Sequence, residues 1–123
     1  TKLNSNSTII GNYNNNLWNI TNADAKYSTD YGSGFKACPY SKTSNADVLL
    51  TTGAYESFAL MNIYDIAGNV WEWTLEKTSD VSGPCAYRGG RYLNNGSDYP
   101  ANYRNNGRTS GISSSIGFRI SLY

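Results

Sequence analysis

The apolar residues of this chain are grouped in short stretches, and the central one, residues 62–74, reads NIYDIAGNVWEWT. It ends in an alternating segment, and successive side chains of a strand point to opposite faces, so Trp71 and Trp73 share one face and Glu72 lies on the other. Each tryptophan brings about 150–250 Å² of surface to bury. We therefore expect both rings in the core, with Gly68 supplying a positive φ before the strand.

A second alternating segment lies near the C-terminal end. Ile116, Phe118, Ile120 and Leu122 alternate with small or polar residues. This pattern predicts a strand with one apolar face.

Shorter apolar runs predict the remaining elements. We expect a short strand or turn near residues 17–20, strands at residues 48–50 and 85–93, and a helical turn within residues 54–60. Gly89-Gly90 indicates a bulge or a close backbone approach. The polar residues 23–47 read as an irregular surface loop.

Composition limits the function. The chain has 123 residues, a net charge of +1 and 15% charged residues, without a basic run. That argues against nucleic acid as a partner. No apolar segment has the length of a membrane span, so we expect no membrane insertion.

The chain contains no histidine, which removes the commonest general base and the histidine metal sites. Cys38 and Cys85 are the only cysteines, too few for a zinc site. The sequence leaves open whether they form a disulfide or remain free thiols.

Three motifs occur in an order that resembles the formylglycine-generating enzyme (sulfatase-modifying factor) family. They are NIYDIAGNVWEWT, Arg88-Gly89-Gly90 with Tyr92, and Ile116-Gly117-Phe118-Arg119. Together they are specific, whereas RGG or GFR alone means little. The resemblance implies an α+β, C-type-lectin-like fold with a small twisted antiparallel sheet and extensive ordered loops. We expect one such domain over residues 1–123, as the C-terminal part of a longer chain.

Residues 91–115 combine the residue types that binding loops favour: tyrosine, arginine, asparagine and serine. A long stretch held between two core strands is usually functional, the alternative being an ordinary polar surface loop. The candidate ligand-binding residues are Arg91, Tyr92, Asn94, Asn95, Ser97, Asp98, Tyr99, Asn102, Tyr103, Asn105, Asn106, Arg108, Ser110, Ser113, Ser114 and Ser115. We expect Leu93, Ile116 and Phe118 to bury apolar area, and Tyr99, Tyr103 and Arg108 to be exchangeable surface residues.

Every Lys, Glu, Trp and Met lies before residue 80. The chain also resembles the lectin-fold variable proteins of diversity-generating retroelements, which end in a similar GFR strand. In them, adenine randomisation of AAC-type codons reaches Asn, Tyr, Ser, Asp, Gly, Arg and Ile, but not Lys, Glu, Gln, Met or Trp. The resemblance implies non-catalytic recognition of a host cell-surface protein or glycan, at a phage or prophage tail or at a bacterial surface.

Two alternatives follow from the same resemblance. A degenerate family domain acting as a structural module is the first, and an active oxidase is the second. Oligomeric state is open, with a trimer formed through an upstream region as one alternative.

The resemblance also raises two metal questions. By position, Asn94 and Tyr99 stand where the enzyme family has its copper-binding cysteines, so we expect no cofactor and no oxidase chemistry. Asn69 and Glu72 could give oxygen ligands to calcium. We favour the alternative that Glu72 forms an ion pair with Arg88 or Arg119.

Overall fold

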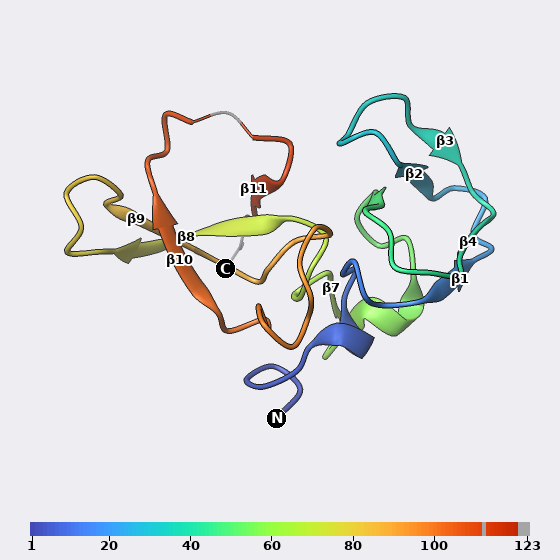
Figure 1. Cartoon of the computed structure of the whole chain (residues 1–123), viewed down its shortest axis with the longest axis horizontal. Helices are drawn as coiled ribbons and strands as arrows, with labels where there is room; N and C mark the ends of the chain where they lie inside the picture. Colours follow the sequence, from blue (N-terminus) through green and yellow to red (C-terminus); the bar gives the residue numbers. More distant parts are fainter. Residues whose placement is uncertain (112, 121–123) are drawn as a thin grey trace.

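A computed structural model describes residues 1–111 and 113–120 (Figure 1). Within this part the chain forms short strands and two 3-10 turns, η1 (Thr8–Ile10) and η2 (Glu56–Phe58), without an α-helix. The expectation of an α+β fold is therefore not supported in its helical part. The turn expected within residues 54–60 is present as η2, and Leu122 lies outside the described residues.

The largest sheet has four strands in the order β10-β9-β8-β11. It consists of β8 (Trp71–Lys77), β9 (Cys85–Arg88), β10 (Arg104–Gly107) and β11 (Ile116–Phe118). The first three pair antiparallel. β11 runs parallel to β8, with Ile116 opposite Trp71, so the prediction of a purely antiparallel sheet is wrong at this edge.

The first half of the chain forms smaller sheets, and Figure 1 shows those of residues 18–50 on the opposite side of the molecule from the four-stranded sheet. One pairs β1 (Trp18–Ile20) with β4 (Tyr40–Lys42). Another places β2 (Lys26–Ser28) between β3 (Lys36–Ala37) and β5 (Leu49–Leu50), and a hairpin joins β6 (Ala59–Leu60) to β7 (Ile63–Tyr64). Residues 23–47 are therefore not an irregular loop, because three strands lie within them.

The main apolar cluster also lies in the first half. Trp18, Ile20, Val48, Leu50 and Phe58 are buried together there. In the second half Trp71 is buried but Trp73 is only half-buried. Both contact the ring of Tyr87, at centroid distances of 5.2 and 5.1 Å, which confirms their shared face but not the central place expected for Trp73.

The last strand differs from its prediction. Phe118 is 74% exposed and Ile120 is 71% exposed, while Ile116 is half-buried. Alternation predicts which residues share a face, but not whether another layer covers that face. β11 is an edge strand, and within the described residues its outer end remains uncovered.

Two glycines hold the backbone where the sequence predicted it. Gly68 has a φ of +68°, and a Cβ there would lie 2.5 Å from the carbonyl oxygen of Asn12. Gly90 has a φ of +71°, and its Cβ would lie 2.6 Å from the carbonyl oxygen of Tyr99. The predicted close approach at Gly89-Gly90 is thus confirmed, and it sets the position of Tyr99.

Candidate functional site

A polar pocket of about 180 Å³ lies over the four-stranded sheet. The sheet contributes Trp71 from β8, Tyr87 from β9, Asn105 from β10 and Ile116 from β11. The connections before β10 and before β11 supply Arg91, Asn94, Tyr99, Ser113 and Ser115. Six of the candidate ligand-binding residues therefore meet in one place, although they come from three separate parts of the chain.

The alternation of side chains along a strand explains why Asn105 is among them. Asn105 lies opposite Tyr87 in the sheet, on the face that carries the tryptophan rings. Its neighbours Arg104 and Asn106 point to the other face. Only Asn105 of β10 therefore reaches the pocket.

An aromatic cluster forms the floor. The buried ring of Trp71 meets the rings of Tyr87, Tyr99 and Tyr103 at centroid distances of 5.2, 6.0 and 6.0 Å. Tyr99 and Tyr103 also pack edge to face, 4.8 Å apart. Tyr99 lines the pocket and is half-buried through these ring contacts, which corrects the expectation that it is a freely exchangeable surface residue. Tyr103 does not line the pocket and is 38% exposed, as expected for a surface residue, although its ring packs against Trp71 and Tyr99.

Arg91 is the charged residue of the pocket. Its Nη1 donates to the hydroxyl of Ser115 at 2.8 Å, and that hydroxyl lies 3.0 Å from the hydroxyl of Ser113. Its Nε is buried and has no hydrogen-bond partner among the described residues. The described lining contains no carboxylate to neutralise this guanidinium.

The two asparagines of the pocket use their oxygens within the chain. The side-chain oxygen of Asn94 accepts the backbone N–H of Arg91 at 3.2 Å. That of Asn105 accepts the backbone N–H of Asn106 at 2.8 Å. Each amide therefore keeps its NH₂ group as the donor available to a ligand.

The asparagine-rich N-terminal segment, residues 7–14, forms hydrogen bonds to the backbone of the segment that supplies Arg91, Asn94 and Tyr99 to the pocket. The sequence did not reveal this role. The backbone N–H of Ser7 donates to the carbonyl of Gly96, and that of Asn14 to the carbonyl of Asn94. The hydroxyl of Tyr13 lies 2.8 Å from the carbonyl oxygen of Gly89. The sequence pattern that could have indicated this role is the mixture of polar and apolar residues in this segment. Such a mixture is typical of an ordinary loop as well as of a segment that hydrogen-bonds to the rest of the fold.

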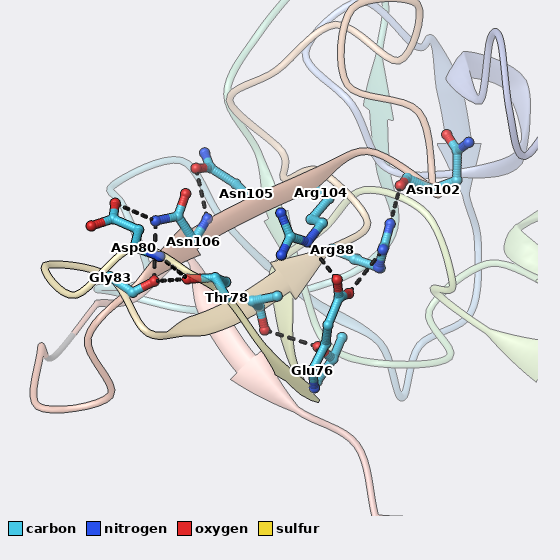
Figure 2. A network of polar contacts seen from close by, with 11 residues as sticks. Glu76, Thr78, Asp80, Gly83, Arg88, Asn102, Arg104, Asn105 and Asn106 are labelled. Carbon is cyan, nitrogen blue, oxygen red and sulfur yellow. Dashed lines mark hydrogen bonds and ion pairs between the residues drawn. The ribbon is translucent and has the colours of Figure 1, made fainter.

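The opposite face of the sheet carries a polar network, shown in Figure 2. Glu76 forms ion pairs with Arg88 at 2.9 Å and with Arg104 at 2.6 Å, and Arg88 holds the pKa of the Glu76 carboxyl below its usual range. The side-chain amide of Asn106 donates to Asp80 and to the carbonyl of Gly83 (Figure 2). Asn106 therefore joins β10 to the loop between β8 and β9 and does not line the pocket.

The other candidate residues divide by burial. Tyr92 is 1% exposed, so its side chain is part of the interior and not of a display surface. Arg108 is exposed and its Nε donates to the carbonyl of Ser82. The remaining candidates are exposed and do not line the pocket: Asn95, Ser97, Asp98, Asn102, Tyr103, Ser110 and Ser114. Leu93, expected in the core, is half-buried.

The residues considered for calcium are engaged within the chain. Both carboxylate oxygens of Glu72 accept from Arg119, at 2.6 and 3.0 Å, so the expected ion pair is confirmed with Arg119. The side-chain oxygen of Asn69 accepts from the amide of Asn12 and the backbone N–H of Leu50. The side-chain oxygen of Asn69 already accepts two hydrogen bonds, and the charge of Glu72 is paired with Arg119.

The residues of the pocket do not fit copper either. Asn94 and Tyr99, at the positions where the resemblance places the copper-binding cysteines, both line it. An amide and a phenol are poor ligands for soft Cu(I), which prefers thiolates. Cys38 and Cys85 are free thiols, and neither lines the pocket.

Comparison with known proteins places the chain in a family. The model of the sulfatase-modifying factor enzyme 1-like domain matches residues 10–122. No curated protein and no solved structure matches the chain. Among the described residues, no helix is long and apolar enough to cross a membrane. The chain belongs to the family of sulfatase-modifying factor enzyme 1-like domains.

Proposed function

We propose that this chain is a non-catalytic recognition domain whose ligand binds in the pocket between Arg91, Asn105 and Ser113. One observation carries the proposal. Six residues of a segment with binding-loop composition meet over an aromatic floor, which is the mixture of rigid rings and adaptable polar groups that binding sites use.

The chemistry of the pocket favours binding over catalysis. Acid–base and nucleophilic catalysis need a group that exchanges a proton or attacks the substrate near neutral pH. The described lining offers an arginine, amides, serine hydroxyls and phenols. No histidine or carboxylate stands beside the serines there to activate them as nucleophiles.

The biological setting that we propose is a phage or prophage tail, or a bacterial surface, with a host cell-surface protein or glycan as the partner. The support is the residue alphabet of residues 91–115, which lacks Lys, Glu, Gln, Met and Trp. The exposed candidates that do not line the pocket, such as Asn95, Ser97 and Ser110, would then be the exchangeable positions.

A binding assay on surfaces tests the proposal. Fluorescently labelled protein is applied to a panel of bacterial cells and to a glycan array. We expect saturable binding to a subset of the surfaces. A chain that serves only as a structural module would bind none of them saturably.

A second assay addresses the oxidase alternative. Incubation with a cysteine-containing sulfatase peptide, copper and oxygen should leave the peptide thiol unchanged. Copper-dependent oxidation of the thiol would overturn the proposal.

A further inference from the structure

We propose that the pocket binds a carboxylate group of its ligand, with Arg91 as the residue that selects it. This inference rests on the proposed function, because it names the chemistry that the same pocket recognises. It follows from the charge of the pocket, from the geometry of Arg91 and from the surrounding donors.

Among the described residues that line the pocket, no carboxylate balances the charge of Arg91. The ion pairs found among the described residues involve Arg88, Arg104 and Arg119. A half-buried guanidinium has lost part of its hydration, and an anionic ligand would replace it. One unpaired positive charge matches one carboxylate, whereas a phosphate dianion would call for further cationic groups.

The guanidinium is held on one side only. Nη1 donates to Ser115, which leaves Nε and Nη2, the two nitrogens that present parallel N–H groups along one edge. This edge matches the two oxygens of a carboxylate. Nε is buried and has no partner among the described residues, so it reaches a ligand only when the guanidinium turns, and that turn breaks no hydrogen bond of Nε.

The serines add a donor whichever way their hydrogens point. The hydroxyl of Ser115 accepts from Arg91, and one of the hydroxyls of Ser113 and Ser115 donates to the other. The pair has two hydrogens and uses one in this contact, so one hydroxyl hydrogen remains for a ligand.

The amides extend the same pattern. The NH₂ groups of Asn94 and Asn105 remain available, since their oxygens accept backbone N–H groups. A pocket with one cation and these donors fits a ligand group that only accepts hydrogen bonds, as an ionised carboxylate does.

The carboxylate could belong to a sugar acid or to an acidic amino acid, and matched pairs of small compounds distinguish them. The first pair is D-glucuronate and D-glucose. The second is N-acetyl-glutamate amide and N-acetyl-glutamine amide. Within each pair only the acid carries the carboxylate. Affinities are measured at low salt by titration calorimetry or by NMR shifts.

We expect at least one acid to bind about tenfold or more tightly than its neutral partner, a difference of about 1.4 kcal/mol. Arg91→Gln should abolish this preference. Arg108→Gln removes an equal charge from an exposed residue outside the pocket, and should leave the affinity within about twofold. If Arg91→Gln lowers the melting temperature, Arg91→Lys serves as the second variant, since it keeps the charge and loses the planar edge.

Three results would overturn the inference: equal binding of acids and neutral partners, an acid preference that survives Arg91→Gln, or no binding of any of the four compounds. If acids and neutral partners bind equally and their binding depends on Asn105, the pocket still recognises a ligand, and only the preference for a carboxylate is refuted. Absence of binding by these compounds would do the same if the chain still binds cells or glycans in the surface assay.

Discussion

The side-chain amide of Asn12 donates to the side-chain oxygen of Asn69 at 3.0 Å, and both residues are buried. The same amide of Asn12 donates to the carbonyl of Val48. Asn69 in turn binds the backbone N–H and carbonyl of Leu50. This pair therefore joins the N-terminal segment, β5 and the start of β8, the strand that carries Trp71 into the pocket floor.

Asn69→Ala should lower the free energy of unfolding by about 3–5 kcal/mol, because it leaves buried groups of Asn12 and Leu50 without partners. Chemical denaturation measures the change. Asn19→Ala is the matched control, since Asn19 is exposed and bonded only to Ser41 at the surface, and should stay within about 0.5 kcal/mol. Equal effects of the two changes would show that the buried pair does not hold the halves together.

Trp71→Ala should cost about 3–5 kcal/mol, because it removes a buried ring that packs against three aromatic neighbours. Phe118→Ala should cost less than about 0.5 kcal/mol, since Phe118 is 74% exposed. Thermal melting of the two variants gives the comparison. A Phe118 variant as unstable as the Trp71 variant would mean that another surface covers β11.

Gly90→Ala should destabilise the protein by more than about 1 kcal/mol. The new Cβ would lie 2.6 Å from the carbonyl oxygen of Tyr99, at a φ of +71°, and would displace a residue of the pocket. Gly111→Ala, whose Cβ would meet its nearest atom at 3.6 Å, is the control. Unchanged melting of Gly90→Ala would show that residue 99 can move freely.

The buried side chain of Lys42 should make the free energy of unfolding depend on pH. Its buried ammonium donates to the carbonyls of Tyr13, Asn14 and Ala46. Burial lowers the pKa of Lys42 to about 8, while Asp47 opposes that shift. The unfolded chain has a lysine pKa of about 10.4 and so binds more protons between these values, which makes stability rise as the pH increases from about 8 to about 10.

The difference in unfolding free energy between the wild type and Lys42→Met isolates this effect, because the other titrating groups are common to both. The wild type should gain on the variant between pH 8 and 10. If the unfolding free energy of the wild type minus that of Lys42→Met stays constant or decreases as the pH rises, the lowered pKa of Lys42 is contradicted.

The second half of the fold was predictable in part from its residue pattern, although the strand expected over residues 85–93 is present only as Cys85–Arg88. The strong alternation around Trp71 and Trp73 predicts β8 and its shared aromatic face, and Gly90 predicts the close approach. β10 was missed because Arg104, Asn105, Asn106 and Gly107 have little strand propensity. Once β10 is known, alternation separates Asn105 from Asn106, which the composition of the segment could not do.

The first half was less predictable for a physical reason. Its strands contain two or three residues each, too few for a period to show. Buried polar residues such as Lys42 and Asn12 also hold this half together. They donate hydrogen bonds to backbone carbonyl groups, and a sequence does not show which carbonyl groups lie nearby. The exposed position of Phe118 was missed because alternation does not show which face is covered.

The central claim is that recognition takes place in the pocket, and a comparison of two double variants tests it most directly. One combines Arg91→Gln with Asn105→Ala in the pocket, and the other combines Asn19→Ala with Ser41→Ala on the β1–β4 sheet. Dissociation constants are measured on the cells or glycans that bind the wild type, after melting curves show that both variants are folded. The pocket variant should bind about tenfold or more weakly, and the β1–β4 variant like the wild type. If the β1–β4 variant loses binding and the pocket variant keeps it, the ligand site lies elsewhere on the chain.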